Sequence, residues 1–157
     1  MSASIERVKE VAQASGLEIA VVSFPDAVRT AAQAAEALGC EISRIVKSLV
    51  FMVAGEHVMA LVPGDRRLDP IKLASAAGRA DSAVRASLDD VRAVTGFVAG
   101  GTPPFGHVSA LRVFSDVGLR RHRTVWAAAG TPHTVFELST DDLDRIARPI
   151  WVDLSES

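Results

Sequence analysis

The sequence predicts a mixed α/β fold in a single compact domain that spans residues 1–157. The length suits one domain, since domains cluster at about 100–150 residues. Patterns typical of helices and of strands are interspersed without the regular alternation of a parallel α/β protein. Two strongly apolar segments, residues 45–53 and 57–63, flank a short turn at residues 54–56, which is typical of an antiparallel hairpin.

Five segments carry the end signals of helices. Serine and threonine can accept a hydrogen bond from a free N–H group of the first helical turn, and proline can occupy the first helical position. Glycine follows four of the five segments and can adopt the left-handed conformation that ends a helix. The predicted helices are residues 5–14 after Ser4, 30–38 from Thr30, 70–77 from Pro70, 87–95 from Ser87 and 139–147 from Ser139.

Eight apolar or alternating segments predict strands. Segment 45–53 is apolar on both faces, with Val46 and Val50 on one side and Leu49 and Phe51 on the other. A strand of this kind is expected in the middle of a sheet that is covered on both sides. The predicted strands are residues 19–24, 45–53, 57–63, 80–85, 111–114, 124–129, 134–138 and 150–154.

Composition limits the class of protein. A hydrophobic content of 48% argues against disorder, and the single cysteine, Cys40, cannot form an internal disulfide, which suits a reducing cytoplasm. No signal peptide is visible, and the uncharged stretch between Arg92 and Arg112 contains too many glycines and prolines for a membrane span. A net charge of −2 argues against a protein that covers nucleic acid with basic charge, but it allows a local basic site.

Lys47 is the first candidate functional residue. Only three of the seventeen basic residues are lysines, and strand alternation places Lys47 on the side of Leu49 and Phe51. A buried ammonium group costs several kcal/mol unless it is solvated or paired. Either Lys47 reaches water at the open end of the strand, or it lies at the mouth of a cavity and binds a phosphate or polarises a carbonyl group.

The second candidate is the loop Gly100-Gly101-Thr102-Pro103-Pro104-Phe105-Gly106-His107. Its glycines let a ligand approach the main chain closely, and its two prolines stiffen it. A stiff glycine loop can direct N–H groups at a developing oxyanion, and only the non-proline residues can donate. A proline-stiffened turn without a ligand is the alternative interpretation.

The remaining polar residues give weaker signals. The four histidines show no metal-ligand spacing, so we do not expect a metal site. His107 and His133 follow the two glycine-containing turns, where each either contacts a substrate or serves a structural role. The basic cluster at residues 120–123 either lies on the solvated surface or binds a few phosphates of a nucleic acid.

Several of these segments, taken together, resemble the YbaK/ProX-type aminoacyl-tRNA deacylases, a family also found as an editing insertion in bacterial prolyl-tRNA synthetases. The resemblance runs in order over about residues 25–154. Lys47 matches the family's functional lysine, and Gly100 and Pro104 match its G-x-x-x-P loop. The segments that carry the resemblance are residues 30–39, 45–51, 95–97, 100–106, 129–132 and 139–143.

The resemblance implies a curved, barrel-like mixed or antiparallel sheet surrounded by helices. It also implies a trans-editing hydrolase that needs no cofactor and deacylates mischarged tRNA, above all tRNA for proline. Its partners would be the tRNA 3′ acceptor end and prolyl-tRNA synthetase. A non-catalytic module that binds tRNA or a synthetase, and a hydrolase of small esters or thioesters, are the alternatives.

The same resemblance assigns roles to residues of this chain. Gly100 and Gly101 would contact the ester near its carbonyl, and Lys47 would hold a phosphate or the carbonyl region. Water would attack with help from the ribose hydroxyl. The chain departs from some members at Gly100–Pro104 and at Gly130–His133, which leaves alanine, cysteine, serine, threonine or a non-protein amino acid as the group removed. The substrate-binding residues implied are Thr102, Pro103, Pro104, Phe105, Gly106, His107, Gly130 and His133.

Overall fold

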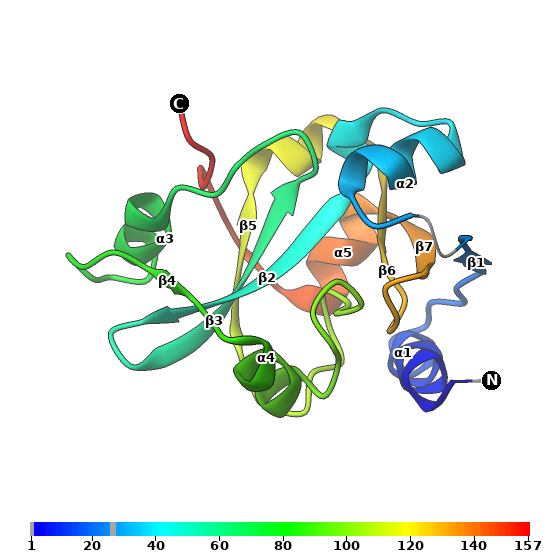
Figure 1. Ribbon diagram of the computed structural model, residues 1–157, viewed down its shortest axis with the longest axis horizontal. Coiled ribbons are helices and arrows are strands. Elements are labelled where there is room, and N and C mark those ends of the chain that lie inside the picture. Colours follow the sequence, from blue (N-terminus) through cyan, green and yellow to red (C-terminus); the bar gives the residue numbers. More distant parts are fainter. Residues whose placement is uncertain (1, 26–27) are drawn as a thin grey trace.

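A computed structural model describes residues 2–25 and 28–157 of the chain (Figure 1). Helices and strands are interspersed, as predicted, and the five predicted helices are all present. Two short 3₁₀ helices, η1 and η2, were not predicted. In chain order the elements are α1 (Ala3–Ala14), β1 (Val21–Ser23), α2 (Ala31–Leu38), η1 (Ile42–Arg44), β2 (Val46–Val53), β3 (Glu56–Pro63), α3 (Pro70–Ala76), β4 (Val84–Arg85), α4 (Leu88–Thr95), β5 (Arg112–Asp116), η2 (Val117–Arg121), β6 (Thr124–Ala128), β7 (Thr134–Ser139), α5 (Thr140–Ala147) and β8 (Ile150–Val152).

The strands form two sheets. The larger has the order β4-β2-β3-β5-β8, and the smaller has the order β1-β7-β6. The predicted hairpin is confirmed, since β2 and β3 pair antiparallel from Val46–Pro63 to Val53–Glu56, whereas β3, β5 and β8 are parallel. A single parallel bridge between Ile45 and Trp126 links the two sheets. The mixed α/β class is therefore confirmed, and the strands do not close into a barrel.

Strand β2 is covered on both faces, as its apolar pattern predicts. Val46 and Val50 pack in a cluster that includes residues of α1, α4, α5 and the smaller sheet. Phe51 and Val53 pack on the opposite face in a cluster that includes Leu73 of α3. In Figure 1, α3 and β4 accordingly lie on one side of the long β2–β3 hairpin, and α1, α2 and the smaller sheet lie on the other.

Side-chain caps explain where the helices begin. Ser2, not Ser4 as predicted, caps α1, because the Ser2 side chain accepts a hydrogen bond from the N–H group of Ser4. Thr30 and Gln33 form a capping box at α2, and the Ser87 side chain caps α4. None of the described helices is long and apolar enough to cross a membrane.

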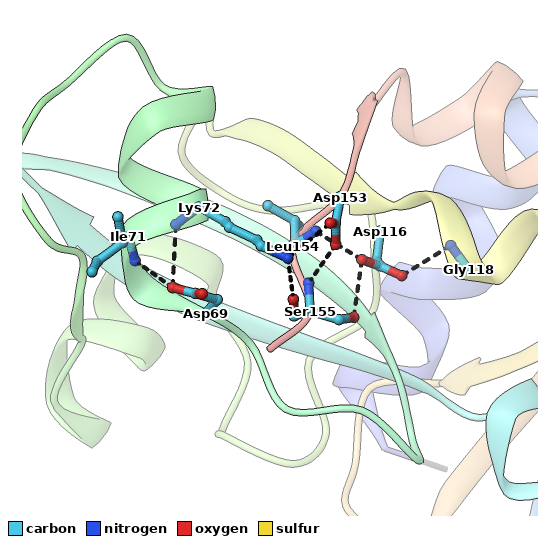
Figure 2. A network of polar contacts seen from close by, with 8 residues as sticks. All are labelled: Asp69, Ile71, Lys72, Asp116, Gly118, Asp153, Leu154 and Ser155. Carbon is cyan, nitrogen blue, oxygen red and sulfur yellow. Dashed lines mark hydrogen bonds and ion pairs between the residues drawn. The ribbon is translucent and has the colours of Figure 1, made fainter. Parts of the chain in front are cut away.

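Asp116 anchors the C-terminal segment to the larger sheet (Figure 2). Its side chain is only 4% exposed. The carboxylate accepts hydrogen bonds from the main-chain N–H groups of Leu154 (2.8 Å) and Gly118 (2.9 Å) and from Ser155 Oγ (3.0 Å). Because a buried carboxylate needs such donors, this residue fixes the position of the chain end.

Lys72 joins α3 to the same segment. Its ammonium group lies 2.8 Å from Asp153 Oδ2 and donates to the main-chain carbonyl of Ser155 at 2.6 Å (Figure 2). These contacts give Lys72 a structural role.

Candidate active site

A cavity of about 570 Å³ opens along one edge of β2, between the two sheets. Its walls come from β2, the start of α2, the β4–α4 connection, the glycine loop and the β6–β7 turn. Among the predicted site residues, Lys47, Gly100 and Thr102 line it together. The polar and charged side chains of the lining also include Arg29, Thr30, Ser48, Arg85, Ser87 and Thr134.

Lys47 is half-buried, and its ammonium group donates a hydrogen bond to the main-chain carbonyl of Arg66. Burial lowers the pKa of Lys47, and the charges of Arg85 and Arg67 lower it further, whereas Asp65 raises it. The carbonyl orients the ammonium group without neutralising it. The group therefore remains available to a negatively charged or polarised ligand.

Ser48 is a lining residue that the sequence pattern did not reveal. Its hydroxyl oxygen is buried and has no hydrogen-bond partner among the described residues. Strand alternation assigns Ser48 and Lys47 to opposite faces, yet both line the cavity, because the cavity follows the edge of β2. Strand β4 pairs with that edge only at Phe51 and Met52. A buried hydroxyl without a partner is costly, so a ligand that bonds to it would gain from the contact.

The first residues of the glycine loop, Gly100–Thr102, form a tight turn in which two groups donate hydrogen bonds to the same carbonyl oxygen. The Gly101 N–H and the Thr102 hydroxyl both donate to the carbonyl oxygen of Val98, each at 3.0 Å. Gly100 has a positive φ of 84°, and a side chain there would meet only Pro132, at 3.9 Å. Gly100 is thus the residue of the loop whose main chain is open to a ligand, whereas the Gly101 N–H is already bonded within the loop.

Gly101 packs directly against the β6–β7 turn. A Cβ atom at this position would lie 2.7 Å from the main-chain carbon atoms of Thr131. Only glycine therefore permits the observed contact between the loop and the β6–β7 turn. This contact brings together two turns that both contribute to the cavity wall.

The second half of the loop, Pro103–His107, lies outside the cavity lining and is buried or half-buried. Pro103 and Pro104 are buried, and Phe105 packs edge-to-face on Phe136, with ring centroids 5.9 Å apart. The Nε2 atom of His107 lies 2.7 Å from the carbonyl oxygen of Pro103. Burial lowers the pKa of His107, and the hydrogen bond that its ring donates to the Pro103 carbonyl partly opposes this shift. The His107 ring thus links the last residue of the loop to the main chain of Pro103, four residues earlier.

Helix α1 contacts both the end of the glycine loop and the β6–β7 turn. The carbonyl of Gly106 accepts a hydrogen bond from Arg7 Nε at 2.8 Å. A Cβ atom at Gly130 would lie 2.8 Å from the main chain of Ser4, so this glycine also packs on α1.

His133 does not line the cavity, although its neighbours do. Its carbonyl oxygen accepts a hydrogen bond from the Phe24 N–H group at 2.7 Å, and its Nδ1 atom is buried without a partner among the described residues. The lining residues from this turn are Pro132, Thr134 and Val135.

The basic cluster at residues 120–123 is partly engaged elsewhere. The Arg120 guanidinium lies over the Trp151 ring, 4.3 Å from its centroid, and pairs with Asp144 at 3.3 Å. Arg121 donates to the carbonyl of Gly118 at 3.3 Å. These contacts favour a structural role for much of the cluster.

The fold is that of a hydrolase domain that edits aminoacyl-tRNA. Residues 25–146 match the aminoacyl-tRNA editing domain, and the chain belongs to this family. The family assignment confirms the resemblance that the sequence segments predict. It also identifies the chain as an enzyme that deacylates mischarged aminoacyl-tRNA.

Known relatives cover different shares of the chain. The uncharacterised protein YwhH of Bacillus subtilis (strain 168) is 35% identical over 136 residues, which is 85% of each protein. The proline–tRNA ligase of Nitratidesulfovibrio vulgaris (strain Hildenborough) is 42% identical over 83 residues, which is 53% of this chain and 14% of the ligase.

Two solved structures share the complete fold. A proposed trans-editing enzyme for prolyl tRNA synthetase is 37% identical, with a TM-score of 0.93 over 100% of this chain and 99% of that one. The hypothetical protein APE2540 is 29% identical, with a TM-score of 0.86 over 96% and 99% of the two chains. The whole architecture, including both sheets, is thus shared with these structures.

Proposed function

We propose that this chain acts as a free-standing trans-editing enzyme that removes a small, wrongly attached amino acid from tRNA for proline. One observation carries the proposal: Lys47 and Gly100, from segments far apart in the sequence, line one cavity in a member of the editing-domain family. The similarity to a proposed trans-editing enzyme for prolyl tRNA synthetase supports the choice of tRNA. Such editing is needed because a synthetase discriminates poorly between similar small side chains.

The proposed reaction is hydrolysis of the ester between the amino acid and the terminal ribose. Water adds to the carbonyl carbon, the bond to the ribose oxygen breaks, and that oxygen takes a proton. The products are the free amino acid and tRNA with both terminal hydroxyl groups. A positive charge and positioned donors stabilise the oxyanion that forms during this attack.

We assign these tasks to residues of the cavity. Lys47 supplies the positive charge, Gly100 lets the ester carbonyl approach the main chain, and the free hydroxyl of Ser48 offers a hydrogen bond to the ester or the ribose. Gly101 and Thr102 hold the turn in shape. The remaining predicted residues do not line the cavity, and we assign them the task of holding the glycine loop and the β6–β7 turn in place. They are Pro103, Pro104, Phe105, Gly106, His107, Gly130 and His133.

The cavity wall suits a small, uncharged side chain. Many of its residues are aliphatic, and several are alanines or valines. Apolar walls favour a side chain that needs no polar partner. The aliphatic wall residues include Ala34, Val46, Val50, Ala128 and Val135.

The proposed partners are the tRNA acceptor end, which enters the cavity as an unpaired strand, and prolyl-tRNA synthetase, which releases the mischarged tRNA. An unpaired end fits a narrow site without extensive basic surface. We accordingly place the enzyme in the cytoplasm, where tRNA is charged.

A panel of mischarged tRNAs tests the proposal. The purified chain is incubated with tRNA for proline that carries alanine, cysteine, serine, threonine or proline, and loss of the ester is followed. We expect faster loss than in buffer for at least one small amino acid and none for proline. Tight binding of every tRNA without ester loss would indicate a binding module, and equal activity on free aminoacyl esters would indicate a general esterase. Either result would overturn the proposal.

A further inference from the structure

We propose that Arg85 and Arg29, beside Lys47, bind the phosphates on the 5′ side of the terminal nucleoside, so that this part of the cavity is a phosphate track for an RNA end. This inference rests on the proposed function and adds a binding site for the strand that leads to the ester. The three residues come from β4, β2 and the segment before α2. All three line the cavity.

Among the described residues, the charged side chains that line the cavity are all cations. The charged residues of the lining are these three cations, and no aspartate or glutamate of the described chain is among them. Elsewhere in the described chain, basic side chains lie against carboxylates: Arg44 on Glu137, Lys72 on Asp153, Arg112 on Glu56 and Arg145 on Asp142. None of the ion pairs among the described residues includes a cation of the cavity. The charge of Asp65 partly offsets that of Lys47, but a cluster of like charges that no described carboxylate pairs with directly still attracts an anion.

The fold directs Arg85 toward Lys47. Arg85 pairs with Phe51 across β4 and β2, so the two side chains lie on the same face of the sheet. The Arg85 guanidinium lies 5.8 Å from the centre of the Phe51 ring. Lys47 lies on that face as well, four residues earlier in β2. Arg85 is near enough for its charge to lower the pKa of Lys47.

The entrance of the cavity adds a further, weaker attraction for anions. Thr30 and Ala31, at the start of α2, line the cavity, and the first turn of this helix holds no acidic residue. The N-terminus of a helix carries partial positive charge. Arg29 precedes this turn directly, so its side chain and the helix end favour the same kind of ligand.

A phosphodiester strand is the ligand that this arrangement fits. Arg29 and Arg85 are exposed cations, whereas most of the other lining residues are apolar, so a charged strand and the esterified end would contact different residues of the lining. Arginine binds phosphate through two parallel hydrogen bonds, whereas lysine acts as a point charge. An aminoacyl group on a nucleoside without phosphates would therefore reach the cavity without engaging Arg85.

Binding of an uncharged RNA end tests the inference independently of catalysis. The probe is the tetranucleotide ACCA, and the variants are Arg85→Gln and, as a matched control, Arg92→Gln, which changes an exposed arginine of α4 outside the lining. We expect Arg85→Gln to weaken binding about tenfold, the usual effect of one charged hydrogen bond, and to reduce the salt dependence by about one phosphate contact. Arg92→Gln should bind as the unaltered chain does.

Kinetics then separate this inference from the proposed function. At neutral pH, Arg85→Gln should raise KM for mischarged tRNA much more than it alters the hydrolysis of aminoacyl-adenosine, which has no phosphate. Equal binding of ACCA by both variants, or AMP bound as tightly as ACCA, would overturn the phosphate track even if the chain edits tRNA. Normal ACCA binding without ester loss on any tRNA would instead overturn the proposed function alone.

Discussion

The ammonium group of Lys47 donates a hydrogen bond to the main-chain carbonyl of Arg66, in the segment that follows β3. This contact orients the lysine with a neutral acceptor instead of a carboxylate. The positive charge therefore persists at the cavity wall, beside the glycine loop. A charge that is positioned but not neutralised is what stabilisation of an oxyanion or a phosphate requires.

The pH dependence of Lys47 gives the first prediction. Burial and the cations Arg85 and Arg67 lower its pKa, with Asp65 in opposition, so deacylation that needs the charged form should decline at a lower pH than for an exposed lysine. The folded chain holds this proton less tightly than the unfolded chain. The resulting cost to stability is present at neutral pH and disappears as pH rises between the two pKa values.

Nuclear magnetic resonance of ¹³C-methylated lysines can follow this titration, because the chain has only three lysines. In Arg85→Gln the pKa of Lys47 should rise, and the decline in activity should move to higher pH with it. An unchanged Lys47 titration in this variant would show that Arg85 does not act on the ammonium group.

The two glycines of the loop should respond differently to alanine. Gly100→Ala places a side chain in open space but at positive φ, so we expect a loss of about 1–2 kcal/mol in the free energy of unfolding. Gly101→Ala brings a Cβ atom within 2.7 Å of the Thr131 main chain and should cost more. Urea unfolding measures both losses. A smaller loss for Gly101→Ala than for Gly100→Ala would contradict the packing described for the loop.

The contribution of His107 to stability should decrease in acid, because burial disfavours its charged ring. Burial lowers its pKa, so its contribution to stability is complete above about pH 6.5, the value for an unfolded histidine, and is lost as pH falls through the lower folded pKa. His107→Ala should reduce stability by about 1–2 kcal/mol through loss of the bond to Pro103. His107→Ala should also reduce the loss of unfolding free energy that occurs as the pH becomes acidic. His107→Gln retains a donor and is the control; equal losses in both variants would argue against the hydrogen bond.

Asp116 offers a test of stability away from the cavity. Asp116→Asn replaces an acceptor of three hydrogen bonds by a side chain that also carries donors, so about 2 kcal/mol or more of unfolding free energy should be lost. The rate of deacylation by the folded fraction should not change, since Asp116 does not line the cavity. A lower kcat at full folding would show that the C-terminal segment influences the site.

Much of the fold follows from local patterns in the sequence. The apolar alternation of β2 predicts a strand covered on both faces, and the end signals predict all five helices. The division into two sheets does not follow locally, because β1 pairs with β7 near the other end of the chain. That pairing depends on packing over a long sequence distance.

The site was predictable only in part for the same reason. Lys47 and Gly100 stand out by residue type, but Arg85 reaches the cavity only because β4 pairs with Phe51. Ser48 was missed because alternation places it opposite Lys47, whereas the cavity follows the strand edge. His107 stands out equally in the sequence, yet in the structure its ring is bonded to the loop itself.

Replacement of Lys47 tests the central claim most directly. The single-turnover rate of ester loss is measured on the mischarged tRNA that the panel selects, for the unaltered chain, Lys47→Met and the control Lys72→Met, whose lysine is remote from the cavity. The account predicts a fall of about 100-fold or more for Lys47→Met with the fold intact by circular dichroism, and an unchanged rate for folded Lys72→Met. A Lys47→Met rate equal to that of the unaltered chain would contradict it.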